Sequence, residues 1–137
     1  FHKNDDVLLV GTGSGYLTEC ISHLTNTVSS YEIDSKLFSF AKNNIDLYSQ
    51  NSYKIELNHR SILDCLDKLI EYKKVIFTCS VDTYKVFVDY LGNDSRSFFF
   101  INQYKSPYKT GIIIDKTRDC YRVKENIVTS QTNQIRD

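Results

Sequence analysis

Three glycines at alternate positions and one carboxylate are the residues of this sequence whose types and spacing suit chemistry. Gly11, Gly13 and Gly15 follow directly on an apolar run at 7–10, and Glu32 stands at the end of the next apolar run. Glycines after a strand permit a tight turn and let a ligand lie against bare backbone. A carboxylate at the tip of the neighbouring strand can accept hydrogen bonds from both hydroxyls of a ribose. The pattern predicts a nucleoside-binding site.

The spacing of the glycines separates this site from two related ones. A dinucleotide-binding turn carries its third glycine one position later, where this chain has Tyr16. A phosphate-binding P-loop ends in Gly-Lys-Ser/Thr, and this loop contains no lysine. The remaining form, G-x-G-x-G, is typical of methyltransferases that use S-adenosylmethionine, a ligand without phosphate. A glycine turn that only packs a helix on a strand is the structural alternative.

Apolar runs alternate with helical patterns along most of the chain, which indicates an α/β fold with a mainly parallel sheet. Expected strands cover 7–10, 27–32, 53–57, 74–79 and 97–101. Expected helices follow the glycines, cover 35–48 with Asp34 or Ser35 as N-cap, and begin at the N-caps Ser61 and Asp82. The side chains expected to face inward from these four helices are, in order, Leu17, Cys20, Ile21 and Leu24; Leu37, Phe38, Ala41, Ile45 and Tyr48; Leu63, Leu66, Leu69 and Ile70; Val86, Phe87, Tyr90 and Leu91.

The end of the chain changes character. Residues 111–114 and 121–128 are separated by a short polar stretch, which predicts a hairpin. A dehydrogenase would normally continue with parallel units instead. We therefore expect one Rossmann-like class I methyltransferase domain over 1–137, with a mostly parallel seven-stranded sheet, a C-terminal antiparallel hairpin and helices on both faces. The polar residues 130–137 are expected to fray.

Composition narrows the functional classes. The 137 residues carry 17 Lys and Arg and 17 Asp and Glu, so no basic field indicates non-specific nucleic-acid binding. The four cysteines are far apart, and three lie on apolar faces or strands, so we expect small buried thiols and no metal site. The sequence has no apolar stretch of membrane-spanning length and no signal peptide, which favours a cytoplasmic protein. The start at Phe1, close to the first strand, favours a chain trimmed upstream.

Residues 11–18, 23–24 and 28–32 resemble protein-L-isoaspartate O-methyltransferases without a gap. Residues 73–78 and the hairpin are also similar to that family, and the resemblance is strongest over 7–34. Transfer-RNA adenosine methyltransferases share a similar Gly-Thr-Gly-Ser-Gly-x-Leu-Thr and a Ser-Tyr-Glu. After the third strand, isoaspartyl enzymes usually carry His-Gly-Asp-Gly, whose aspartate holds the adenine amino group. Here the segment reads His59, Arg60, Ser61 and Ile62, so a serine replaces the acid.

The resemblance implies S-adenosylmethionine as cofactor, S-adenosylhomocysteine as product, and O-methyl transfer to a protein carboxylate of the isoaspartyl type. It implies that the glycine loop lines the methionine and ribose, that Glu32 binds the ribose hydroxyls and that Ile33 stacks under the adenine. Ser61 and Ile62 would flank the adenine edge, although Ser61 could be only a helix cap and Ile33 only core packing. The implied cofactor-binding set is Gly11, Thr12, Gly13, Ser14, Gly15, Glu32, Ile33, Ser61, Ile62 and Thr78.

No catalytic residue is predicted. Methyl transfer from a sulfonium chiefly needs alignment, and a carboxylate acceptor is already ionised, so no general base is required. His59 as a base is disfavoured, because a lone histidine after a strand is more often structural or exposed. Cys79 as a nucleophile is disfavoured, because nothing nearby in the sequence would lower its pKa. A protein or peptide substrate is expected, and a nucleic acid stays open. The alternatives are a transfer-RNA or small-molecule methyltransferase, and a non-catalytic binding module with a degenerate methyltransferase fold.

Overall fold

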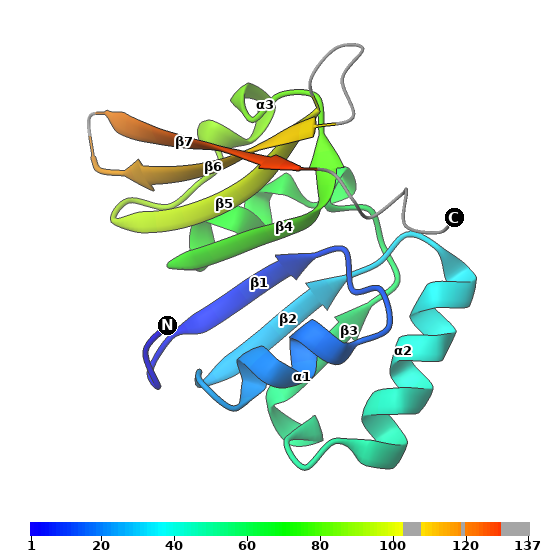
Figure 1. Cartoon of the computed structure of the whole chain (residues 1–137). Helices are drawn as coiled ribbons and strands as arrows, with labels where there is room; N and C mark the ends of the chain where they lie inside the picture. The colour runs from blue at the N-terminus through cyan, green and yellow to red at the C-terminus, as the bar shows by residue number, and fades with distance from the viewer. Residues whose placement is uncertain (103–107, 119, 130–137) are drawn as a thin grey trace.

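One mixed sheet organises the protein. The computed structural model describes residues 1–102, 108–118 and 120–129, whose strands have the order β3-β2-β1-β4-β5-β6-β7 (Figure 1). The strands are β1 (Asp6–Val10), β2 (Thr27–Tyr31), β3 (Ile55–Asn58), β4 (Lys74–Val81), β5 (Ser95–Asn102), β6 (Tyr108–Lys116) and β7 (Tyr121–Thr129). The first five pair in parallel, whereas β6 and β7 form an antiparallel hairpin on β5. The predicted fold class is confirmed.

Helices cover both faces of the parallel part of the sheet. They are α1 (Tyr16–Ser22), α2 (Ser35–Tyr48) and α3 (Lys85–Val88), with three 3-10 turns, η1 (Ser52–Lys54), η2 (Ile62–Asp64) and η3 (Leu66–Glu71). α1 packs on one face, and α3 with η2 and η3 packs on the other (Figure 1). Within the described residues, no helix has the length and apolar character needed to cross a membrane.

β1 is buried on both of its faces. Val7 and Leu9 pack with Ile21 of α1, while Leu8 and Val10 join the larger apolar cluster on the α3 side. In a strand, successive side chains point to opposite faces, so an unbroken apolar run is what a central parallel strand requires. This is why 7–10 was readable as the first strand.

Three phenylalanines form the centre of the larger cluster. The Phe77 ring lies 4.7 Å from the Phe87 ring of α3 and 4.6 Å from the Phe99 ring of β5, measured between centroids. Phe77 and Phe99 are almost fully buried. The aromatic packing fixes β4 against β5 and α3, next to the carboxyl ends of the strands.

The third and fourth expected helices are wrong in type or extent. The segment after Ser61 forms 3-10 turns, because Cys65 adopts φ −145° and ψ 43° and interrupts the helix. Its expected inward residues Leu63 and Ile70 are 61% and 65% exposed. The helix expected after Asp82 shrinks to the four residues of α3, and the Asp82 carboxylate accepts from Asn102 instead of capping.

The inward faces of the first two helices also differ from expectation. α1 buries Thr18, Ile21 and Ser22, whereas the expected Leu17 and Leu24 are exposed. Buried hydroxyls are tolerated here because they have hydrogen-bond partners: Thr18 donates to Ser30 Oγ, and Ser22 donates to the Glu19 carbonyl.

The second helix buries a narrower stripe than expected. In α2 only Ala41 and Ile45 are buried, and the expected Leu37 and Tyr48 are exposed. The predicted N-cap is confirmed, since the Asp34 carboxylate accepts from the backbone N–H groups of Lys36 and Leu37.

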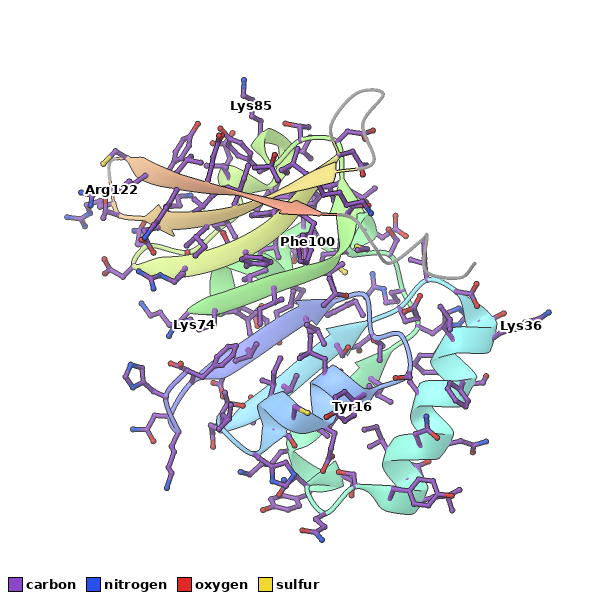
Figure 2. The ribbon with its side chains drawn as sticks, in the orientation of Figure 1. Tyr16, Lys36, Lys74, Lys85, Phe100 and Arg122 are labelled. Atoms are coloured by element: carbon purple, nitrogen blue, oxygen red, sulfur yellow. The ribbon has the colours of Figure 1, made fainter. Side chains whose placement is uncertain are left out.

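Two further expectations concern thiols and charge. All four cysteines are free, but only Cys65 is buried, and Cys79 and Cys120 are exposed, so the expectation of three buried thiols was wrong. Cationic side chains extend from separate parts of the molecule, as Lys36 on α2, Lys85 on α3 and Arg122 on β7 illustrate (Figure 2).

Candidate functional site

A cavity of about 210 Å³ lies where the carboxyl ends of β1, β2 and β4 meet. The chain leaves β1 toward β2 on one side, while β4 pairs with β1 on the other, so this is the topological switch point of the sheet. Crevices at such points are where open α/β sheets bind ligands. The lining residues are Val10, Gly11, Tyr31, Glu32, Ile33, Arg60, Ser61, Ile62, Leu63, Phe77, Cys79, Val81 and Phe87.

The glycine loop needs its glycines for two different reasons. Gly11, Gly13 and Gly15 all have positive φ, at 100°, 57° and 89°. A Cβ on Gly11 would also collide with the Thr78 hydroxyl, so the loop touches β4 there. Gly13 has open space where its Cβ would stand, and therefore presents bare backbone to a ligand.

Glu32 joins the glycine loop to the start of α2. Glu32 is only 8% exposed. Its Oε1 accepts from the Gly13 N–H at 2.9 Å, and its Oε2 accepts from the Asp34 N–H at 3.1 Å. Each carboxylate oxygen has a second lone pair, so both oxygens keep acceptor capacity for a ligand hydroxyl. The predicted ribose-binding carboxylate thus lines the cavity and already holds the loop in place.

Of the five predicted loop residues only Gly11 lines the cavity, whereas Thr12, Gly13, Ser14 and Gly15 do not. The Thr12 side chain is buried, and its hydroxyl lies 2.5 Å from Ser30 Oγ of β2. Ser14 and Gly15 line a separate small cavity toward α2, where Asn44 Nδ2 donates to the Ser14 carbonyl at 3.0 Å. Thr12 and Ser14, predicted to bind the cofactor, thus connect the glycine loop to β2 and to α2.

The three expected adenine-binding residues all line the cavity. Ile33 is 69% exposed and contributes an apolar side chain that no core packing explains. Ile62 is buried and lines the same cavity. The Ser61 hydroxyl accepts from the Leu63 N–H at 3.2 Å, so Ser61 is the N-cap of η2, which is the alternative role considered for it. Ser61 also lines the cavity.

The remaining candidates differ in where their polar atoms point. Thr78 Oγ1 donates to loop carbonyls and is absent from the lining residues of the cavity, whereas Cys79 lines it. Although Cys79 as a residue is exposed, partial desolvation of its sulfur, with a further contribution from the Glu32 carboxylate, raises the pKa of the Cys79 thiol, which agrees with its rejection as a nucleophile. His59 stacks on Phe38 and contacts the Ile33 carbonyl at 3.2 Å, a structural role.

Sequence reasoning missed several residues of the site. Arg60 and Tyr31 line the cavity, and burial raises the pKa of Tyr31 to about 12, so its phenol stays protonated. Beyond the end of β4, the Asp82 carboxylate accepts from Asn102 Nδ2 of β5 at 3.0 Å, next to the lining residue Val81. Asp82 and Asn102 are 20 positions apart in the sequence, so only the pairing of β4 with β5 brings them together.

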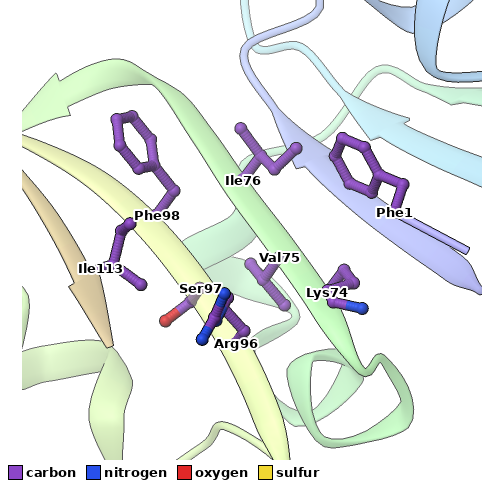
Figure 3. A pocket seen from close by; sticks show the side chains of 8 residues that line it. All are labelled: Phe1, Lys74, Val75, Ile76, Arg96, Ser97, Phe98 and Ile113. Carbon is purple, nitrogen blue, oxygen red and sulfur yellow. The ribbon is translucent and has the colours of Figure 1, made fainter. Parts of the chain in front are cut away.

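A larger cavity of about 310 Å³ lies on the α1 side of β4, β5 and β6, where no described helix covers the sheet (Figure 3). Its apolar lining residues are Phe1, Val75, Ile76, Phe98 and Ile113. Its two cations are each paired with a carboxylate: Lys74 Nζ lies 2.9 Å from Asp5, and Arg96 Nε lies 2.6 Å from Asp115. This cavity therefore offers apolar surface and little free hydrogen-bonding capacity.

The residues of the smaller cavity fit the expected cofactor. The Glu32 oxygens retain acceptor capacity for ribose hydroxyls, and Ile33 with Ile62 provides apolar surface for a purine. The open backbone of Gly13, which donates to Glu32 beside the cavity, can admit an uncharged chain. No lining residue provides a phosphate cradle. Among the described residues, no three His, Cys, Asp or Glu side chains are grouped to hold a metal ion.

Comparison with solved structures places the fold among methyltransferases. A Plasmodium falciparum protein described as a protein-L-isoaspartate O-methyltransferase, in complex with S-adenosyl-L-homocysteine, has a TM-score of 0.73 and 17% identity over 93% of this chain and 63% of its own. A protein-L-isoaspartate O-methyltransferase has a TM-score of 0.75 and 21% identity over 93% of this chain and 41% of its own. A tRNA methyltransferase from Aquifex aeolicus has a TM-score of 0.61 and 14% identity, covering 93% and 59%. The chain thus spans less than two thirds of each of these structures.

Sequence comparison assigns the family. No curated protein matches the chain. The family model for ribosomal RNA adenine dimethylase matches residues 1–86, which include β1, the glycine loop, Glu32 and the whole of β4. The match covers more than half of the 137 residues. The chain therefore belongs to the ribosomal RNA adenine dimethylase family, a family of methyltransferases whose cofactor is S-adenosylmethionine.

Proposed function

We propose that this chain binds S-adenosylmethionine in the cavity beside the glycine loop and methylates an amino group of adenine in RNA. The observation that carries the proposal is Glu32, a nearly buried carboxylate at the switch point whose two oxygens face the glycine loop and the start of α2. The cofactor supplies a methyl group activated on a sulfonium sulfur. Glu32 would bind the ribose, Gly11 and Gly13 the methionine portion, and Ile33, Ser61 and Ile62 the adenine.

Asp82 supports an amino group as the methyl acceptor. It follows Val81 at the carboxyl end of β4, and its Oδ1 is held by Asn102. A carboxylate there can accept an N–H of an adenine amino group, but it would repel the carboxylate of an isoaspartyl residue. The only cation lining the cavity among the described residues is Arg60, which follows β3 rather than β4.

The isoaspartyl substrate predicted from the sequence stays a second candidate. Its support is the resemblance over 7–34 and the likeness of fold to two isoaspartate methyltransferases. Both candidates share the cofactor site, and they differ in the charge of the acceptor that must approach the end of β4.

Methylation with tritiated S-adenosylmethionine separates the two candidates. We expect label in an unstructured, adenine-rich RNA and none in an isoaspartyl peptide. Asp82→Asn should lower RNA labelling about tenfold while leaving S-adenosylhomocysteine affinity within about twofold of wild type. Labelling of the peptide alone would establish the second candidate. Cofactor binding without labelling of RNA, protein or metabolite fractions would establish the non-catalytic binding module.

A further inference from the structure

β4 departs from regular pairing just before it reaches the site. Ile76 pairs with Phe98 and Ser80 pairs with Phe100, so three residues of β4 span the interval that Phe99 alone spans on β5. Irregularities of this kind re-aim side chains and are enriched beside functional sites. Thr78 is the middle residue of this irregular segment, and the shift directs its hydroxyl toward β1 and the glycine loop.

The Thr78 hydroxyl holds the first residues of the loop. Oγ1 lies 3.0 Å from the Val10 carbonyl and 2.5 Å from the Gly11 carbonyl, so one hydroxyl hydrogen serves two acceptors. On its other side, the Gly11 N–H donates to the Tyr31 carbonyl of β2 at 2.8 Å. Gly11 is thus fixed between β2 and β4, with Thr78 supplying the side-chain hydrogen bond from β4 to this loop.

The contact also explains why residue 11 is glycine. A Cβ at this position would collide with Thr78 Oγ1 and would approach the Cys79 backbone nitrogen to 3.1 Å. The loop and β4 are therefore closer than any side chain on residue 11 would allow. The absence of a side chain at Gly11 thus makes room for the Thr78 hydroxyl of β4.

From these contacts we propose that Thr78 is a positioning residue, which fixes the glycine loop against the irregular segment of β4 without touching the cofactor. The inference rests on the proposed function. Cys79 of this segment and Val81 after it line the cavity, so the hydroxyl of Thr78 connects the cofactor side of the site to the acceptor side. This assigns Thr78 a role different from the direct cofactor contact expected from the sequence.

Thr78→Val and Thr78→Ser test the proposal as a matched pair. Valine keeps the branched shape and loses the donor, whereas serine keeps the donor. Gly92→Ala is the control for general destabilisation, because its Cβ would meet the Ile70 carbonyl oxygen at 2.7 Å, away from the cavity. Two readouts are used: amide hydrogen exchange at Gly11 and Gly13 in the free protein, and the affinity for S-adenosylhomocysteine by calorimetry.

We expect Thr78→Val to accelerate exchange at both amides and to weaken S-adenosylhomocysteine about tenfold, Thr78→Ser to restore both, and Gly92→Ala to change neither. Unchanged exchange in Thr78→Val, or failure of serine to restore it, would overturn the proposal. If the wild-type protein bound no S-adenosylhomocysteine, the proposed function would fail, while the exchange measurement would still decide the role of Thr78.

Discussion

The cavity beside the glycine loop and the cavity on the α1 side of β4, β5 and β6 differ in chemistry more than in size. The first measures about 210 Å³, is lined by a carboxylate with acceptor capacity and lies beside the open backbone of Gly13. The second measures about 310 Å³, yet its cations Lys74 and Arg96 are already paired. Ligand sites are recognised by convergent polar groups in a concave apolar setting, so the smaller cavity is the site.

The two regions also use hydrogen bonds differently. Glu32 after β2, Asn44 of α2 and Thr78 of β4 each form a hydrogen bond with the backbone of the glycine loop. The Thr12 hydroxyl of the loop forms a hydrogen bond with Ser30 of β2. The uncovered face presents Phe98 and Phe100 in edge-to-face contact at 5.0 Å. Rigid polar support belongs to the region that must hold a ligand, whereas the apolar face contributes packing.

Among the substitutions that compare the two cavities, Gly13→Ala should have the largest effect on ligand affinity. A Cβ there enters the open space in front of the loop, so S-adenosylhomocysteine affinity should fall about thirtyfold or more, near 2 kcal/mol. The positive φ of 57° should cost only about 1 kcal/mol of stability. Calorimetry and thermal unfolding of the same samples measure both quantities. Equal affinity in variant and wild type would mean that the ligand does not approach this backbone.

Phe98→Ala should show the opposite behaviour. The ring is half-buried in the wall of the larger cavity, so its loss should lower the free energy of unfolding by about 1–2 kcal/mol. The affinity for S-adenosylhomocysteine should stay within about twofold of wild type, because the cofactor site does not include this wall. Urea unfolding with and without ligand provides the measurement. A selective loss of ligand affinity would reverse the assignment of the two cavities.

The Cys79 thiol offers a smaller, chemical test. Burial of the sulfur and the nearby Glu32 carboxylate raise its pKa above the ordinary 9.0, so alkylation by iodoacetamide should accelerate only at high pH. S-Adenosylhomocysteine should slow the reaction at Cys79 about threefold or more, because this residue lines the cavity. Exposed Cys120 in the hairpin turn is the internal control. Mass spectrometry can follow both thiols, and equal protection of both would contradict the assignment.

The ion pair at the edge of the larger cavity should have the smallest effect. The hydrogen bond from Arg96 holds the pKa of Asp115 below its usual value. A carboxylate with a depressed folded-state pKa stabilises the protein above its unfolded-state pKa, and this contribution is lost as pH falls through the folded-state value. Asp115→Asn should therefore lower the melting temperature by about 1–2 °C at pH 7, and the difference should shrink as the pH falls below the unfolded-state pKa. A pH-independent difference would point to packing.

Much of the fold was predictable because its signals are local. The run at 7–10, the glycines and the polar break around 116–119 mark a buried strand, a tight turn and a hairpin through residue types alone. The errors arose where tertiary context decides. α1 turns Thr18 inward because Ser30 offers a hydrogen-bond partner, and Cys65 interrupts the third helix with a dihedral that no propensity indicates.

The same distinction between local signals and tertiary context applies to the residues of the candidate site. Glu32, Ile33, Ser61 and Ile62 line the cavity, since the first two directly follow β2 and the other two lie within four residues of the end of β3. The placement of Thr78 beneath the loop and the pairing of Asp82 with Asn102 depend on the irregular segment of β4 and its pairing with β5. Such cross-strand relationships are invisible in one sequence, because register is set by three-dimensional packing.

Calorimetric titration with S-adenosylhomocysteine, comparing wild type with Glu32→Ala and Glu32→Gln, measures whether Glu32 binds the cofactor. We expect micromolar binding that weakens about tenfold or more in the alanine variant, about 1.4 kcal/mol, and less in the glutamine variant, which keeps one acceptor oxygen. Circular dichroism checks that all three proteins are folded. Absence of binding by the folded wild type, or equal affinity in all three, would show that Glu32 does not form a cofactor site.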